Sequence, residues 1–165
     1  MNYLTIPLNT AHNKTKFSCG QELLDTYLHK QAKQDVKRHL SACFVIADDN
    51  NEVKGYYTLS SASIDRELIP EDIKNKLPMS YINLPVTLLG RLARDKSLNG
   101  KNFGEKLLLD ALKRCYETSS TIGSMAVIVD PIDEYAKKFY LKYGFIYLPD
   151  SRKMFLTMKT ISELF

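Results

Sequence analysis

The stretch that most clearly indicates chemistry is a polar loop, rich in glycine and lysine, that leads into an amphipathic segment. The loop follows an apolar run and carries Asn99, Gly100, Lys101, Asn102 and Gly104. Backbone N–H groups at a helix start lack intrahelical acceptors and lie at the positive end of the helix dipole. A loop with few side chains at that place can bind phosphate groups. The loop therefore indicates an anion site, although a plain strand-to-helix turn would have the same composition.

A basic stripe lies on a long predicted helix near the start of the chain. Its members are Lys30, Lys33, Lys37 and Arg38. A net charge of +4 permits a polyanionic partner, such as nucleic acid or a phosphorylated cofactor. A solvated helix face explains the stripe equally well, so its residues alone leave both readings open.

The sequence offers little for metal, thiol or histidine chemistry. Its three cysteines have no metal-ligand spacing and cannot all pair, which is typical of a reducing compartment. All three histidines lie in the first quarter of the chain. No signal peptide and no run of ~18 apolar residues is found. We therefore expect a full-length, soluble, cytoplasmic protein with no metal site and no membrane contact.

The hydrophobic pattern predicts one domain spanning residues 1–165, with strands and helices in one mixed sheet architecture, α/β or α+β. We expect strands at 3–8, 42–47, 52–63, 86–94, 125–129, 145–148 and 154–158. We expect helices from about 18 to 40, within 65–77, and at 103–118 and 134–143. The two buried strands on either side of helix 103–118 form a βαβ crossover, so they should be parallel.

Several single residues give local expectations. Ser18 and Gln21 fit a capping box at the start of the first helix. Asp133 should cap the last long helix, and Gly144 should end it in the left-handed conformation. Gly55, inside a strand, suggests a bulge or the close approach of another segment.

These elements resemble the GNAT superfamily of acyl-coenzyme A acyltransferases. In that family, a loop of pattern Gln/Arg-x-x-Gly-x-Gly/Ala wraps the pyrophosphate of acetyl-CoA. The corresponding residues here read Asn99-Gly100-Lys101-Asn102-Phe103-Gly104, with departures at Asn99 and Asn102. Asparagine adopts a positive φ more readily than most residues, so the turn can be kept at Asn102. The resemblance implies a mostly antiparallel sheet with a splayed parallel pair of central strands and helices on both faces.

A narrower resemblance, to the GNAT toxins of type II toxin-antitoxin pairs, covers nearly the whole chain. It rests on the run GRLARDKSLNGKNFGEKLLLDALKRC, on Phe139-Tyr140 with Gly144-Phe145, and on Phe17-Ser18-Cys19-Gly20 with the following LLDTYLHKQA. Those toxins acetylate the α-amino group of the amino acid on a charged tRNA and so stop translation. A ribbon-helix-helix antitoxin neutralises them. The resemblance implies aminoacyl-tRNA and such an antitoxin as partners, and leaves a homodimer open.

The resemblance also implies roles for particular residues. The groups expected at acetyl-CoA are Leu92, Ala93, Arg94, Asn99, Gly100, Lys101, Asn102, Phe103, Gly104 and Glu105. The groups expected at tRNA are Lys30, Lys33, Lys37, Arg38 and Arg91. Tyr140 is the expected general acid, because a phenol with a pKa near ~10 keeps its proton at neutral pH and can donate it to a thiolate. On its own, a tyrosine on that apolar helix face would also be explained as a core residue.

No general base is evident, which fits an α-amine acceptor. Such amines titrate near ~7.7, well below a lysine side chain near ~10.4. Two other functions stay open at the level of the sequence. One is a GNAT enzyme that acetylates a small-molecule amine or a peptide N-terminus. The other is a non-enzymatic module that binds acyl-CoA or nucleic acid.

Overall fold

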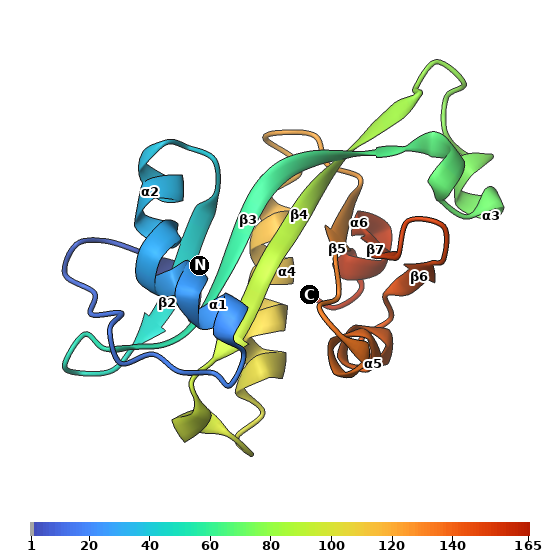
Figure 1. The fold of residues 1–165 in the computed structure, drawn as a ribbon. Helices are drawn as coiled ribbons and strands as arrows, with labels where there is room; N and C mark the ends of the chain where they lie inside the picture. The colour runs from blue at the N-terminus through green and yellow to red at the C-terminus, as the bar shows by residue number, and fades with distance from the viewer. Residues whose placement is uncertain (1) are drawn as a thin grey trace. The chain divides into compact units, whose positions relative to one another are not determined.

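A computed structural model describes residues 2–165 and shows strands and helices alternating along the chain (Figure 1). The strands are β1 (Ile6–Pro7), β2 (Ala42–Ala47), β3 (Val53–Asp65), β4 (Asn83–Arg94), β5 (Ala126–Val129), β6 (Ile146–Leu148) and β7 (Lys153–Thr157). The α-helices are α1 (Glu22–Thr26), α2 (Ala32–Lys37), α3 (Glu71–Lys74), α4 (Phe103–Thr118), α5 (Glu134–Lys142) and α6 (Met158–Ser162). A π-helical turn, η1 (Tyr27–Gln31), joins α1 to α2, and short 3-10 turns lie at η2 (Arg66–Leu68) and η3 (Lys96–Leu98).

The strands form one seven-stranded sheet in the order β1-β2-β3-β4-β5-β7-β6. The pairs β1–β2, β2–β3, β5–β7 and β6–β7 are antiparallel. The pair β4–β5 is parallel, with Thr87 opposite Val127 and Leu88 opposite Ile128. The predicted parallel crossover through α4 is therefore confirmed, as is the mixed, mostly antiparallel sheet.

The chain divides into two compact units. Unit 1 contains residues 1–60 and 89–111, and unit 2 contains residues 61–88 and 112–165. The single domain predicted from the sequence stays a prediction.

Unit 1 buries apolar side chains on both faces of its strands. On one face, Tyr56 of β3 contacts Phe17 and Tyr27, and its hydroxyl donates to the Leu24 carbonyl at 2.7 Å. On the other face, a Cβ at Gly55 would lie 3.0 Å from Leu107 of α4, so the expected close approach at this glycine is confirmed.

Within unit 1, a buried aspartate on α4 holds the start of the chain through hydrogen bonds. Asp110 accepts hydrogen bonds from the Leu4 N–H and the Thr5 hydroxyl, each at 2.6 Å, and from the Tyr57 hydroxyl at 2.8 Å. Buried carboxylates are costly unless their oxygens are hydrogen-bonded, and here three donors satisfy them.

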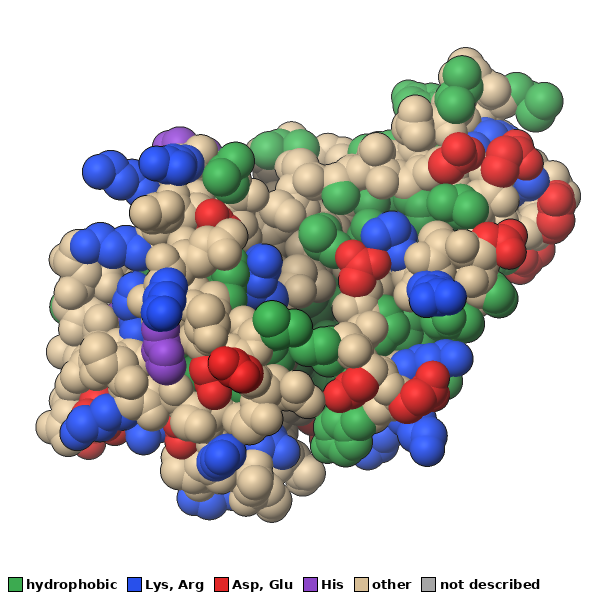
Figure 2. Space-filling model, viewed as in Figure 1, with side chains coloured by type: hydrophobic (Ala, Val, Ile, Leu, Met, Phe, Trp, Pro, Cys, Tyr) green, Lys and Arg blue, Asp and Glu red, His purple; other side chains and the backbone are tan. Residues whose placement is uncertain are grey.

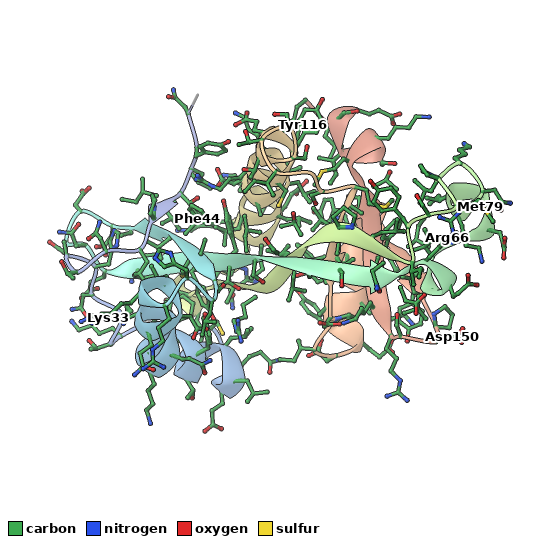
Figure 3. All side chains as sticks on the ribbon, turned by 90° about the horizontal axis from the view of Figure 1, so that it is seen from above. Lys33, Phe44, Arg66, Met79, Tyr116 and Asp150 are labelled. Carbon is green, nitrogen blue, oxygen red and sulfur yellow. The ribbon has the colours of Figure 1, made fainter. Side chains whose placement is uncertain are left out.

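Unit 2 has its own core, to which β3, β4, β5, β6 and β7 contribute. Its buried members are Ile64, Ile69, Leu84, Val86, Ala126, Ile128, Leu148 and Phe155. Arg66 organises the segment between β3 and β4 (Figure 3), because its guanidinium donates to four backbone carbonyls, at Lys74, Leu77, Pro78 and Tyr81. Acidic side chains gather over α3, at the right of Figure 2.

Four local predictions about helices and strands were wrong or incomplete. The first helical segment begins at Glu22, and its N-cap, Gln21, makes no side-chain capping bond, so the Ser18–Gln21 capping box is absent. The same segment is interrupted by the π-helical turn η1. The predicted strand at 154–158 ends at Thr157, where the Thr157 hydroxyl accepts a hydrogen bond from the Thr160 N–H and begins α6. Residues 65–77 form two short turns in place of one helix.

Other local predictions are confirmed. Helix α4 has the predicted bounds. The Asp133 carboxylate caps α5 by accepting from the Ala136 N–H, and Gly144 follows that helix with φ +93°. Among residues 2–165, the structure has no helix that is long and apolar enough to cross a membrane.

Candidate active site

Asp95 fixes the entry to the glycine-bearing loop. Its carboxylate accepts from the Ser18 N–H at 2.9 Å, and from the N–H and hydroxyl of Ser97 at 3.0 and 2.8 Å. Burial alone would raise the pKa of Asp95, but these hydrogen bonds, with the charge of Lys54, outweigh burial and hold the pKa below its usual value. Two backbone bonds complete the frame: the Asp95 N–H donates to the Lys54 carbonyl and the Lys96 N–H to the Ser18 carbonyl, each at 2.8 Å.

The loop itself has the backbone conformation that the phosphate-site prediction requires. Gly100 has φ +77° and Asn102 has φ +54°, so the positive φ expected at Asn102 is present. The Arg94 guanidinium donates a hydrogen bond to the Asn99 side-chain oxygen and joins the end of β4 to the loop. Helix α4 starts at Phe103, so its first backbone N–H groups have no intrahelical acceptor. The residues from Leu92 to Glu105 thus form one continuous strand, loop and helix start within unit 1.

Arg91 lies on β4 directly before Leu92 and Ala93. Its guanidinium carbon is 3.5 Å from the centre of the Tyr27 ring, a cation–π contact. Tyr27 is buried, and its hydroxyl donates to Asp35 at 2.9 Å. Arg91 was an expected tRNA contact from the family resemblance, but its contact with Tyr27 was not predicted, because no spacing rule links residues 64 positions apart.

The basic stripe is exposed. Lys30 lies in η1, Lys33 and Lys37 lie in α2, and Arg38 follows α2. Figure 2 shows Lys and Arg side chains gathered over this helical segment, and Lys33 extends from it in Figure 3. Among the described residues, none of the four forms an ion pair.

Tyr140 lies in unit 2, on the last turns of α5. Its ring is 8% exposed and is packed edge-on against Phe139 and Phe145, with ring centres 5.3 and 5.2 Å away. Burial raises its pKa well above the usual value for a phenol. None of the hydrogen bonds among residues 2–165 involves the Tyr140 hydroxyl.

The other titratable side chains offer no clear alternative catalyst. Burial raises the pKa of Cys43 and Cys115 to about 12, so neither supplies a thiolate at neutral pH. The buried His12 accepts from the Asn9 N–H, and His29 hydrogen-bonds to the Phe17 carbonyl. The described residues contain no cluster of side chains that could hold a metal ion.

Comparison with known proteins identifies the family. No protein-family model matches the chain. A tRNA-acetylating toxin of Mycobacterium tuberculosis is 35% identical over 158 residues, which cover 95% of this chain and 93% of that protein. The chain belongs to the GNAT family of tRNA-acetylating toxins. The family predicted from the loop and the later aromatic motif is therefore confirmed.

Two solved structures of GNAT toxins share this fold. AtaT in complex with acetyl-methionyl-tRNAfMet has a TM-score of 0.90 and 27% identity, and the match covers 99% of each chain. A tyrosine-to-phenylalanine mutant of AtaT, bound to the C-terminus of the antitoxin AtaR and acetyl-CoA, has a TM-score of 0.82 and 25% identity. That match covers 100% of this chain and 99% of the other.

Proposed function

We propose that this protein transfers the acetyl group of acetyl-CoA to the α-amino group of the amino acid on a charged tRNA, and thereby blocks translation. The observation that carries the proposal is the 35% identity, over nearly the whole chain, to a tRNA-acetylating toxin. The structures of AtaT with acetyl-methionyl-tRNA and with acetyl-CoA support the same substrate and donor.

The loop and strand of unit 1 fit the acetyl-CoA phosphates and arm. We assign the pyrophosphate to the loop from Asn99 to Gly104 and to the start of α4 at Glu105, because the first N–H groups of α4 have no intrahelical acceptor and the two positive-φ residues keep the turn tight. The backbone of β4 from Leu92 to Arg94 is assigned to the pantetheine arm. When bound, acetyl-CoA supplies an activated acetyl group. A backbone N–H at Leu92 or Ala93 would stabilise the negative charge that develops on the acetyl oxygen.

Tyr140 is assigned as the general acid. Its buried phenol stays protonated at neutral pH, and its hydroxyl has no competing partner among the described residues. It can therefore donate a proton to the sulfur of the departing thiolate, whose pKa by analogy with cysteine is about 8.5, as the C–N bond forms and the C–S bond breaks. The proton that the amine loses on becoming an amide then returns the phenolate to the phenol. The acceptor needs little base assistance, since an α-amine with a pKa near ~7.7 is already partly neutral at physiological pH.

The partners follow from the same proposal. Lys30, Lys33, Lys37 and Arg38 are unpaired cations on one exposed segment, which suits the phosphates of tRNA and predicts binding that weakens with salt. An antitoxin partner is supported by the AtaT complex with AtaR. A cytoplasmic location suits a charged-tRNA substrate and three free cysteines.

The test is acetyl transfer to charged tRNA. Incubation with acetyl-CoA and aminoacyl-tRNA should yield N-acetylated aminoacyl-tRNA, detected by mass spectrometry of the released nucleoside, and should stop a cell-free translation reaction. Omission of acetyl-CoA should restore translation. Acetylation of free amines or peptides with no product on charged tRNA would replace this function with that of a small-amine or peptide acetyltransferase.

A further inference from the structure

Arg91 is a half-buried cation that forms no ion pair with any described residue. Among residues 2–165 its guanidinium takes part in no hydrogen bond or ion pair, and its one recorded contact is the Tyr27 ring at 3.5 Å. A buried or half-buried charge is costly when nothing pairs with it, and arginines in such places usually hold a carboxylate or phosphate. The missing partner therefore points to a ligand.

The surroundings of Arg91 hold the guanidinium in one place. The Tyr27 side chain is 5% exposed, and the centre of its ring lies 6.3 Å from the centre of the nearly parallel Tyr56 ring. Its hydroxyl donates a hydrogen bond to Asp35 at 2.9 Å. The Ala32 N–H donates to the Tyr27 carbonyl, five residues earlier, which makes the π-helical turn η1. Such turns are rare, and many lie at functional sites. The Asp35 carboxylate accepts the Tyr27 hydroxyl and, among residues 2–165, forms no ion pair with Arg91.

A guanidinium that lies against an aromatic ring keeps its N–H groups in the plane of the fork, where they can bind a phosphate through two parallel hydrogen bonds. The positive charge of Arg91 also affects the pKa of Tyr27. Burial raises the pKa of Tyr27 to about 12, the hydrogen bond to Asp35 adds to this increase, and the charge of Arg91 opposes it.

The phosphate could belong to acetyl-CoA or to tRNA, and the position of Arg91 along β4 favours tRNA. Arg91 directly precedes Leu92 and Ala93, which we assign to the acetyl group, whereas the loop at Asn99 to Gly104 is assigned to the cofactor phosphates. The acceptor at the acetyl group is an aminoacyl ester, which has no negative charge of its own. The nearest anion on that substrate is the phosphodiester that precedes its terminal adenosine.

We propose that Arg91, positioned by Tyr27, binds the phosphodiester that precedes the terminal adenosine of the charged tRNA. This inference rests on the proposed function. It identifies the phosphate through which the charged tRNA would be oriented for acetyl transfer. Arg91 is then a substrate-binding residue, and Tyr27 is a positioning residue that acts through Arg91.

Two minimal acceptors isolate this contact. One is a 3′-O-aminoacyl-adenosine with a free 5′ hydroxyl, and the other is the same ester with a 5′ methyl phosphate diester. The wild-type protein should favour the phosphate-bearing ester by about tenfold to a hundredfold in kcat/KM, the effect expected of one charge-assisted hydrogen-bonding contact. Arg91→Gln should reduce this ratio to near one, and Arg91→Lys should give a value between the two.

Variants of Tyr27 test the positioning role. Tyr27→Leu removes the ring beneath the guanidinium and should lower the ratio mainly through KM for the phosphate-bearing ester. Tyr27→Phe keeps the ring and should rescue most of the ratio. Lys76→Gln, which removes one exposed charge elsewhere, should keep the wild-type ratio. The Kd of acetyl-CoA should be unchanged in every variant.

The outcomes separate the competing explanations. A full ratio in Arg91→Gln would overturn the proposal, and the Arg91→Lys and Tyr27→Phe values decide it if Arg91→Gln does not fold. A weaker Kd for acetyl-CoA with an unchanged ratio would assign Arg91 to a cofactor phosphate instead. If the wild-type protein acetylates neither ester nor intact aminoacyl-tRNA, the proposed function itself fails, and the inference fails with it.

Discussion

The pyrophosphate-loop region and the Tyr140 region hold their functional groups in opposite ways. Around the loop, Asp95 accepts three hydrogen bonds, and Arg94 and Asn99 are joined by another. Around Tyr140, the contacts are the edges of aromatic rings, and the hydroxyl is left without a partner among the described residues.

The difference follows from what each region must do. A phosphate site needs backbone N–H groups fixed in direction, and the hydrogen bonds of Asp95 with Ser18 and Ser97 fix the entry to the loop that carries them. A proton donor needs an accessible hydroxyl that holds its proton at neutral pH, and apolar packing keeps Tyr140 protonated because burial disfavours the phenolate. Four predictions test this contrast.

The largest expected effect is at the hydroxyl of Tyr140. Tyr140→Phe should lower kcat by about 10²- to 10⁴-fold, the usual contribution of a general acid, with the Kd of acetyl-CoA and the midpoint of thermal unfolding unchanged. Tyr135→Phe, at an exposed tyrosine of the same helix, is the matched control and should keep full kcat. If turnover survives in Tyr140→Phe, Tyr140 is only a core residue.

The next effect is at Asp95. Asp95→Ala leaves the Ser18 and Ser97 donors without their acceptor, so the free energy of unfolding should fall by about 2 to 3 kcal/mol. The Kd of acetyl-CoA should rise about tenfold in calorimetric titration, because the loop entry is no longer fixed. Asp130→Ala, which breaks only the exposed ion pair with Lys153, should cost at most about 1 kcal/mol. An unchanged Kd in Asp95→Ala would contradict the framing role.

Acid and alkali should weaken the two regions separately. The lowered pKa of Asp95 contributes stability above its ordinary value near ~4, and this contribution is lost as the pH falls below it. The raised pKa of Tyr140 contributes stability below ~10, which is lost as the pH rises above that value. Denaturant unfolding from pH 2 to 11 should show slopes of at most about 1.4 kcal/mol per pH unit for each group. The acid slope should shrink in Asp95→Asn and the alkaline slope in Tyr140→Phe. If the acid slope is unchanged in Asp95→Asn, or the alkaline slope in Tyr140→Phe, that group does not cause the pH dependence of stability.

The smallest effect is at Asn102, where the loop departs from the family pattern. Asn102 has φ +54°, which glycine adopts more easily, so Asn102→Gly should change the free energy of unfolding by less than about 1 kcal/mol. The Kd of acetyl-CoA should stay equal or tighten slightly, since the backbone N–H groups keep their places. Loss of binding would show that the Asn102 side chain itself contacts the cofactor.

The sequence was sufficient to predict those features of the fold that depend on residues close together in the chain. Helix α4 was found at Phe103–Thr118 because its apolar spacing is regular, and the cap at Asp133 was found because capping is a relation within one turn. The predicted capping box at Ser18 is absent because the Ser18 N–H donates to Asp95, 77 residues away, and the helix begins only at Glu22. The stacking of Arg91 on Tyr27 and the π-helical turn depend on tertiary packing, which periodicity does not encode.

The bond between Leu4 and Asp110 spans 106 residues and has a consequence for synthesis. Unit 1 is made of the first 60 residues and a second segment that ends at Ala111, so its core is complete only after α4 has been synthesised. Contacts so distant in sequence form late, because a long loop must close first. The loop from Asn99 to Gly104 therefore takes its place in unit 1 only after about two thirds of the chain has been translated.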